Sequence, residues 1–462
     1  MFLMISYVAG LFLLASATPS VEIAPGAFVD SVACEAEPQY SYALYLPSSY
    51  DAERKWPLIL AFDPSGAGAQ PVRGFRAAAE RYGYIVVGSN DSRNYTGWGA
   101  KMPAAAAVWR DVAARFSIDA GRVYTAGFSG GARMATEVAL KTRAVAGVFA
   151  VGGSFRERDG IDGPISFVFA GSSGTRDMNH REMQRVHARL LERELPTRHL
   201  VFDGPHQWPP EDDFTAAVEW FELQAIRRGL RAADESHVKN IYDIAIRRAR
   251  SRRAPEVALS DYEQIARDFE GLVALDDVEA AIERLRDDPA AARGNKARQR
   301  WIRYEDSARQ RLVAQMRKME ASVNDAGRRA GDLRDLRREI ERHVGDSESD
   351  DKLRADAAGR LVAFVTTVGY ERGIVAGQNG EHERAALFYE IALQGAPESR
   401  GLRIMLAGMY ARMGRVERAL EALAEAVQLG FADADRLRAD EHLEPLREDL
   451  RFIELLAELD SR

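Results

Sequence analysis

Arg122-Val-Tyr-Thr-Ala-Gly-Phe-Ser-Gly-Gly-Ala-Arg-Met-Ala135 is the stretch that decides the fold of this chain. It begins with residues typical of a strand, Val123 to Ala126, and continues after Gly131 as a run typical of a helix. The pattern Gly-x-Ser-x-Gly places Ser129 on the turn between them, and its glycines let the strand and the helix approach closely. Such a turn lifts the Ser129 hydroxyl out of a sheet and puts the N–H of Gly130 at the start of a helix.

The first half of the chain alternates short apolar runs with helical segments. Strands are expected at residues 40–46, 57–62, 84–88, 123–126, 145–151, 165–170 and 199–202, and helices at 75–82, 104–116, 132–140, 181–195 and 214–228. Residues 18–38 are expected to form an irregular lead-in. Strands that alternate with helices predict a parallel sheet with helices on both faces. In such a sheet the turn at Ser129 has the form of a nucleophile elbow, so we predict an α/β-hydrolase domain over residues 18–230.

The chain changes character after residue 230. Arg, Asp, Glu and Ala dominate residues 231–350, and strand signals become sparse. Apolar residues recur there at spacings of three and four, as on one helix face: Leu312, Met316, Met319, Val323, Ala326, Ala330 and Leu333. A charged helical linker or bundle is therefore expected over 231–350, and a specific binding role is the alternative.

Residues 351–462 contain an internal repeat. Five positions recur after 34 residues, pairing Gly373 with Ala407, Ala385 with Ala419, Tyr389 with Leu423, Ala392 with Ala426, and Pro397 with Phe431. This period, with small residues where helices would cross, resembles tetratricopeptide repeats. Two repeats are few, so flanking helices at 353–364 and 446–456 are expected to cap them. The repeats predict a protein partner for this part of the chain.

Composition and the N-terminal residues point to a globular protein outside the cytoplasm. The 462 residues carry a net charge of −7 and are 46% hydrophobic and 29% charged, which does not suggest a nucleic-acid-binding protein. The one cysteine, Cys34, excludes an intramolecular disulfide. Residues 2–14 are almost wholly apolar and precede Ala15-Ser-Ala17, so residues 1–17 are predicted to be a signal peptide of a periplasmic or secreted protein. If uncleaved, this segment would instead be a membrane anchor.

A serine on an elbow of this kind needs an acid and a histidine, which follow it in that order. His206 lies in a loop directly after the last expected strand, at the sheet edge where sites in such folds lie. Asp177 lies in the loop after the preceding strand, and capping the next helix is its alternative role. Asp162 and Asp203 are the rival acids. His180 shares the loop of Asp177 and is a further candidate for lining the site.

The same chemistry needs N–H donors for a negatively charged oxygen. One is expected at Gly130, and the second at or near Asp63, in the loop after the strand at 57–62. No metal or cofactor is predicted. Four loop side chains are candidates for lining a substrate pocket, with plain packing as the alternative: Asn90, Arg93, Trp98 and Trp208.

Several segments together resemble a known family. They are PLILAFDPSG at 57–66, GSNDSR at 88–93, AGFSGGARM at 126–134, TRDMNHREM at 175–183 and GPHQWP at 204–209. They look like secreted α/β-hydrolases related to dienelactone hydrolases and to polyhydroxybutyrate or feruloyl esterases, some of which carry C-terminal tetratricopeptide repeats. The resemblance covers roughly residues 38–228 and implies ester hydrolysis by a triad of Ser129, Asp177 and His206. The chain departs from the family at Asp63-Pro64, where many relatives have a His-Gly pair.

These observations predict a serine hydrolase that cleaves a small carboxylic ester through an acyl-enzyme. A serine peptidase of the same fold is one alternative, because an elbow does not distinguish an ester from an amide. The alternative from another class is a scaffold whose repeats bind a partner and whose hydrolase domain has lost its activity.

Overall fold

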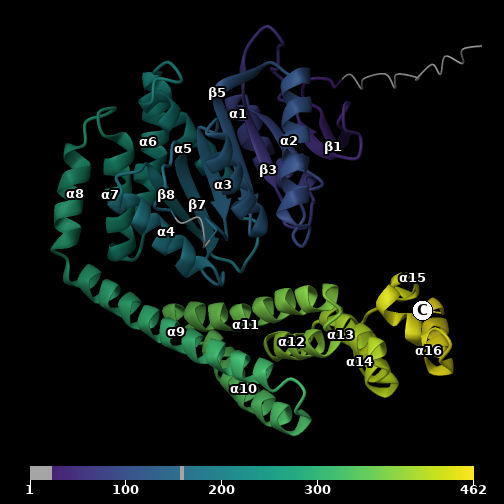
Figure 1. The fold of residues 1–462 in the computed structure, drawn as a ribbon. Coiled ribbons are helices and arrows are strands. Elements are labelled where there is room, and N and C mark those ends of the chain that lie inside the picture. The colour runs from purple at the N-terminus through teal and green to yellow at the C-terminus, as the bar shows by residue number, and fades with distance from the viewer. Residues whose placement is uncertain (1–22, 157–160, 462) are drawn as a thin grey trace, which may run out of the picture.

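The computed structural model describes residues 23–156 and 161–461, and the predicted signal peptide lies outside these ranges. Figure 1 shows two parts, a sheet surrounded by helices and a helical arm that lies along one edge of that sheet. Among the described residues, no helix is both long and apolar enough to cross a membrane.

Eight strands form one sheet in the order β1-β2-β4-β3-β5-β6-β7-β8. Their bounds are β1 Phe28–Ala33, β2 Ser41–Tyr45, β3 Trp56–Phe62, β4 Ile85–Ser89, β5 Ile118–Phe128, β6 Gly147–Val151, β7 Val168–Gly174 and β8 Thr197–Phe202. β2 is antiparallel to both β1 and β4, and the remaining pairs are parallel. The α/β fold is confirmed, and the sheet is mixed rather than parallel throughout because β2 is antiparallel to its two neighbours.

The expectation of an irregular lead-in is wrong, because that segment contains β1. β1 is a half-exposed edge strand, and its pairing with β2 is irregular between Val29 and Val32. An edge strand with a bulge lacks the regular alternation by which strands are recognised in a sequence. β7, in turn, ends at Gly174 rather than Ala170, because the small residues Gly-Ser-Ser-Gly continue the buried strand.

Five helices cover the two faces of the sheet in the N-terminal part, called the hydrolase part after the sequence prediction. They are α1 Ala69–Tyr82, α2 Trp98–Arg115, α3 Gly130–Thr142, α4 His180–Glu192 and α5 Glu211–Arg227. One buried apolar cluster joins the sheet to α2, α3 and α4, and a second joins its other face to α1 and α5. The loops that follow the carboxyl ends of the parallel strands meet at one end of these layers.

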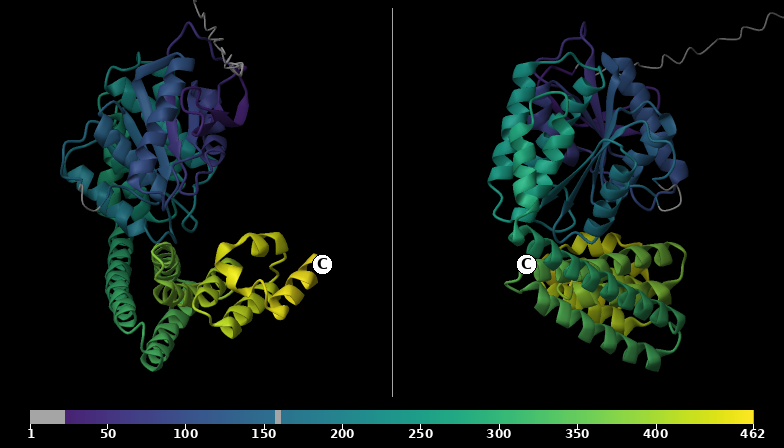
Figure 2. Two further views of the ribbon diagram at one scale, coloured as in Figure 1. Left: turned by 45° about the vertical axis from the view of Figure 1, so that its right-hand side comes forward. Right: turned by 90° about the vertical axis from the view of Figure 1, so that its left-hand side faces the viewer.

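Three more helices extend this part beyond residue 230: α6 Glu235–Arg250, α7 Pro255–Phe269 and α8 Asp276–Arg286. They form an outer layer beside the sheet, as the right-hand view of Figure 2 shows. One apolar cluster joins them to Leu223 and Ile226 of α5. Trp220 of α5 donates from its indole nitrogen to the buried Asp268 of α7, at 2.7 Å.

The helical arm begins at residue 289. Its helices are α9 Pro289–Ala321, α10 Ala326–Ser347, α11 Lys352–Gln378, α12 His382–Gly395, α13 Arg400–Arg412, α14 Val416–Gln428, α15 Ala434–Ala439, η1 Glu441–Leu446 and α16 Leu450–Asp460. The apolar face expected along 312–333 is divided between α9 and α10, since Asp325 caps the start of α10. The helix expected at 353–364 continues unbroken through α11.

Small residues of the predicted repeat lie at helix crossings in the arm. The aligned alanines have no exposed surface: Ala385, Ala392, Ala407, Ala419 and Ala426. Gly373 lies so close to the ring of Tyr389 that a Cβ there would collide with it. This packing explains the small residues physically, and the assignment to tetratricopeptide repeats stays a prediction.

Candidate active site

Ser129 lies on the sharp turn between β5 and α3. Its φ of +53° is in a region that residues with a side chain rarely adopt. A Cβ on Gly127 would collide with the carbonyl oxygen of Gly131, so both the strained turn and the glycine are needed to bring strand and helix together. The backbone N–H of Ser129 donates to Val151 of β6 at 2.8 Å, which fixes the turn against the sheet.

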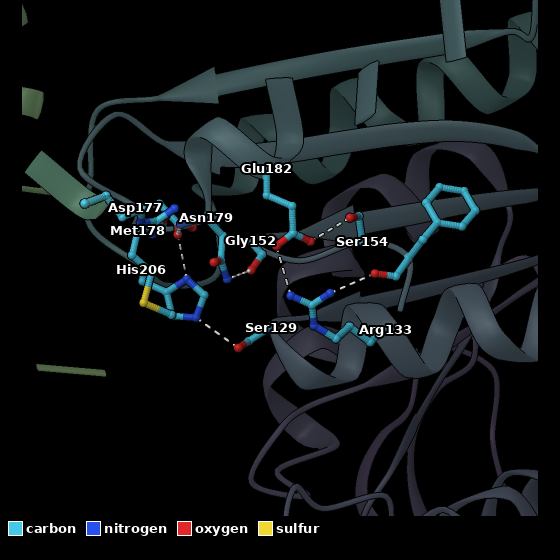
Figure 3. A network of polar contacts seen from close by, with 11 residues as sticks. Ser129, Arg133, Gly152, Ser154, Asp177, Met178, Asn179, Glu182 and His206 are labelled. Atoms are coloured by element: carbon cyan, nitrogen blue, oxygen red, sulfur yellow. Dashed lines mark hydrogen bonds and ion pairs between the residues drawn. The ribbon is translucent and has the colours of Figure 1, made fainter. Parts of the chain in front are cut away.

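The structure brings Ser129, His206 and Asp177 into one line of hydrogen bonds (Figure 3). Ser129 Oγ lies 2.9 Å from His206 Nε2, and His206 Nδ1 lies 2.9 Å from Asp177 Oδ1. Because a carboxylate only accepts, Nδ1 carries the proton, and Nε2 is free to accept the serine proton. Asp177 has no exposed surface, whereas the histidine side chain is 17% exposed, so a substrate can approach from the serine and histidine side.

Backbone hydrogen bonds fix the two loops that carry the acid and the histidine. The N–H of Thr175 donates to Phe202 O, and the N–H of Arg176 donates to Gly204 O, both at 2.9 Å. The N–H of Asn179 donates to Asp177 Oδ1 at 2.7 Å, which orients the carboxylate. The acid loop and the histidine loop are therefore one hydrogen-bonded unit at the ends of β7 and β8.

The rival acids and His180 lie elsewhere. Asp203 is exposed and pairs with Arg176 at 2.6 Å and with Lys352 at 3.2 Å, and hydrogen bonds from these cations lower its pKa. Asp162 pairs with an arginine at the surface. His180 is buried below the acid loop, hydrogen-bonded to Ser173, and burial lowers its pKa.

The N–H donors expected from the sequence lie at the start of α3 and in the loop after β3. Gly130 is the first residue of α3, so its N–H has no acceptor within the helix. Asn94 was not anticipated from the sequence, yet a Cβ on Gly130 would collide with its side-chain oxygen. The N–H of Asn94 donates to Pro64 O at 2.7 Å, so this residue joins the Asp63 loop to the elbow. Asn94 directly follows the segment GSNDSR at 88–93, and this position is the signal in the sequence that could have indicated it.

The side chain of Asp63 connects the loop after β3 to the histidine loop. It is buried, accepts from the N–H of Ser65 at 2.8 Å, and accepts from Trp208 Nε1 at 2.8 Å. Trp208 also packs on Phe128, whose ring lies 4.5 Å from that of His206. Trp208 is 8% exposed, so its role in the structure is to hold the histidine loop against the Asp63 loop.

The other three pocket candidates are spread around the β4–α2 loop. Asn90 accepts from the N–H of Gly68 at 3.2 Å and donates to Ser41 at 3.2 Å, which makes it a bridge between loops. Arg93 is exposed and lies against Gly66. Trp98 begins α2 and stacks under the Arg156 guanidinium, 4.4 Å from its ring centroid. None of these contacts identifies a substrate-binding role.

A second polar network lies beside the triad (Figure 3). Arg133, one turn after the nucleophile on α3, donates to Glu182 of α4 at 3.0 Å and to Phe155 O at 2.8 Å. Glu182 also accepts from Ser154 at 2.7 Å. This network ties the elbow helix to α4, and the sequence offered no spacing rule that would pair these residues. Among the described residues, no group of three or more histidine, cysteine or acidic side chains is placed to hold a metal ion.

Comparisons with known proteins give partial matches. No family model matches the chain. It is 33% identical over 92 residues to a chloroplastic protein of Arabidopsis thaliana; the match covers 19% of this chain and 28% of that protein, so the chain spans less than a third of that relative.

Solved structures similar to this chain are hydrolases and esterases by name. The S-formylglutathione hydrolase of Staphylococcus aureus is 12% identical, with 42% of this chain and 98% of that chain covered and a TM-score of 0.34. An esterase of Pyrobaculum calidifontis is 12% identical, covering 44% and 87% with a TM-score of 0.35. A ferulic acid esterase is 16% identical, covering 42% and 95% with a TM-score of 0.34.

Proposed function

We propose that this protein is a serine hydrolase that cleaves small carboxylic esters through an acyl-enzyme. The observation that carries the proposal is the line Ser129–His206–Asp177, with 2.9 Å at each hydrogen bond and the serine at the N-terminus of α3. A hydroxyl, an imidazole and a buried carboxylate in this order activate a serine as a nucleophile.

The reaction proceeds in two halves. Ser129 Oγ attacks the ester carbonyl carbon while its proton passes to Nε2 of His206, and Asp177 stabilises the imidazolium through Nδ1. His206 then gives that proton to the departing alkoxide, which leaves as an alcohol. Water, deprotonated by the same nitrogen, attacks the acyl-enzyme and releases the carboxylic acid and the free serine.

The oxyanion formed in each half is held by N–H donors. The N–H of Gly130 lies at the positive end of the α3 dipole, and the Asp63 loop is held beside it through Asn94. A backbone N–H at or near Asp63 is the proposed second donor. Donors fixed in a water-poor site stabilise a developing charge without reorganising at the moment of reaction.

The test combines labelling with turnover. The intact protein should react with a fluorophosphonate probe and hydrolyse short p-nitrophenyl esters. Ser129→Ala should abolish labelling and lower kcat by about 10⁴-fold or more. Ser166→Ala, a change at an exposed loop serine, is the matched control and should leave both unchanged. Turnover retained in Ser129→Ala would refute the assignment.

The alternatives give different results in the same assay. A peptidase would also cleave a p-nitroanilide at a measurable rate, whereas an enzyme restricted to esters would cleave only the p-nitrophenyl ester of the same acyl group. A scaffold without activity would fail to label, although the chain would still fold. The intact line of three hydrogen-bonded residues supports an active enzyme.

We also propose a periplasmic or secreted location and a protein partner for the arm. The first follows from the apolar residues 2–14 before Ala15-Ser-Ala17, and the second from the 34-residue repeat. N-terminal sequencing of the mature protein should begin at Thr18. Soluble cytoplasmic protein that keeps its initiator methionine would contradict the location, and membrane-bound protein that keeps it would identify an anchor.

A further inference from the structure

Two arginines of the helical arm reach the loop that carries Asp177. Arg309 of α9 donates from Nη2 to the carbonyl oxygen of Met178 at 2.7 Å. Arg360 of α11 donates from Nη1 to the carbonyl oxygen of Thr175. The two acceptors lie on either side of Asp177, so the arm binds the acid loop both before and after the acid.

Each arginine also contacts the other of the two helices, α9 and α11. Arg360 is buried and makes a bidentate pair with Glu305 of α9, with Nε 3.1 Å from Oε1 and Nη2 2.7 Å from Oε2. The guanidinium of Arg309 lies 4.2 Å from the ring centroid of Phe364 of α11. These cross-contacts leave each guanidinium little freedom, which is what accurate positioning of a partner requires.

The buried pair of Arg360 and Glu305 is poorly explained as a stabilising contact. Removing two charges from water costs about as much as their attraction returns, and apolar replacements of such pairs are often neutral. Such a pair can instead serve to orient a third group. Here it directs the remaining guanidinium nitrogen of Arg360 at the acid loop.

Other contacts also join α11 to these loops. Lys352, at the start of α11, lies 3.2 Å from the carboxylate of Asp203 in the histidine loop, and Asp356 of α11 lies 3.7 Å from Arg176 of the acid loop. Burial raises the pKa of Glu371 of α11, and the nearby His206 and Arg133 oppose that rise.

We propose that Arg309 and Arg360 are positioning residues that hold the Asp177 loop in its working geometry, so that the helical arm completes the active site. The proposal rests on the proposed function, because it takes Asp177 as the acid of the triad. Displacing a catalytic group by about 1 Å can cost about 100-fold in rate, so two hydrogen bonds to its loop are sufficient to matter.

The experiment uses the full chain. Arg309→Ala should lower kcat on a short p-nitrophenyl ester about 10- to 100-fold while KM changes less than about threefold. Arg309→Lys should recover part of the loss, since an ammonium can still donate to Met178 O. Arg317→Ala, at an exposed arginine further along α9, is the matched control and should behave as wild type.

A double-mutant cycle separates positioning from general damage. If Arg309 acts through Asp177, adding Arg309→Ala to Asp177→Asn should cost less than about twofold more. Equal losses in both backgrounds, or an unchanged kcat in Arg309→Ala, would overturn the proposal. If Ser129→Ala and Asp177→Asn keep full activity, the proposed function fails instead.

A second variant keeps the test decisive if Arg309→Ala does not fold. Replacing Glu305 and Arg360 together by Met removes the donor to Thr175 O without leaving a buried charge. This protein should melt near the wild-type temperature and still show a lower kcat. A wild-type kcat in the folded double variant would refute a positioning role for Arg360.

Discussion

At the scale of single residues, burial distinguishes Asp177, the proposed acid, from its rivals. Asp177 has no exposed surface and receives hydrogen bonds from His206 and from the N–H of Asn179. Asp203 lies in the adjoining loop, but its carboxylate is 63% exposed and turns outward to Arg176 and Lys352. Proximity along the chain to His206 therefore did not decide which carboxylate meets the ring.

Substitution of each aspartate by asparagine compares the contributions of the two acids to kcat. Asp177→Asn should lower kcat about 10⁴-fold, because the amide favours the wrong tautomer of His206 and no longer stabilises the imidazolium. Asp203→Asn should stay within about threefold of wild type, since exposed ion pairs contribute about 0–1 kcal/mol. Kinetics at equal folded fraction, checked by circular dichroism, measure both. A collapse of kcat in the Asp203 variant alone would reverse the assignment.

At the scale of elements, the contact between Trp208 and Asp63 joins two loops from opposite ends of the hydrolase sequence. Trp208→Phe should keep the aromatic packing on Phe128 but leave Asp63 Oδ2 without its indole donor. A buried acceptor that loses its partner costs about 1–3 kcal/mol, so the free energy of unfolding should fall by that amount and the urea midpoint should fall with it. Trp98→Phe, near the surface of the same part, is the control. An unchanged midpoint in Trp208→Phe would show that the contact does not stabilise the fold.

His187 of α4 and His199 of β8 predict a pH dependence of the free energy of unfolding. Burial lowers the pKa of His187 to about 4, helped by Arg267, and that of His199 to about 3, helped by His187, both from 6.5. Below pH 6.5 the unfolded chain therefore takes up protons that the folded chain does not bind. The free energy of unfolding should fall as the pH drops below 6.5 and continue to fall toward about pH 4.

Urea denaturation at about pH 7 and about pH 5 checks this dependence. His199→Gln keeps a polar partner for Ser173 without a titrating group, so its stability should vary less over that interval. An equally steep dependence in the variant would assign the effect to other groups.

The sequence predicts elements well where one local pattern determines them. The buried strands β3 and β4 and the elbow between β5 and α3 follow from apolar runs and from the glycines around Ser129. β1 was not predicted, because it is a half-exposed edge strand. Pairing with β2 stabilises it rather than an alternation of apolar and polar residues. The line of Ser129, Asp177 and His206 was predictable from chain order. Asn94 and Arg133 were not, because their partners lie far away in the sequence.

At the scale of the whole molecule, the part that contains the sheet packs against helices beyond the change in composition at residue 230. Leu223 and Ile226 of α5 are 1% and 8% exposed because α6, α7 and α8 cover them. Charged, alanine-rich helices look like a linker in the sequence, since their apolar faces are narrow and their partners are distant. Figure 1 shows how these helices lead into α9, which carries the chain to the edge of the sheet where the acid loop lies.

Two truncations separate these contributions. A chain ending near residue 231 should aggregate or melt early, because it exposes Leu223, Ile226 and the indole nitrogen of Trp220 that Asp268 accepts from. A chain ending near residue 287 keeps that layer and should stay soluble with a cooperative melting transition. It lacks Arg309 and Arg360, so its kcat should be about 10- to 100-fold below that of the full chain, with the fluorophosphonate label still reaching Ser129. Full kcat in the 287-residue form would show that the arm does not shape the site, and equal stability of the 231-residue form would show that α6 to α8 lie outside the core.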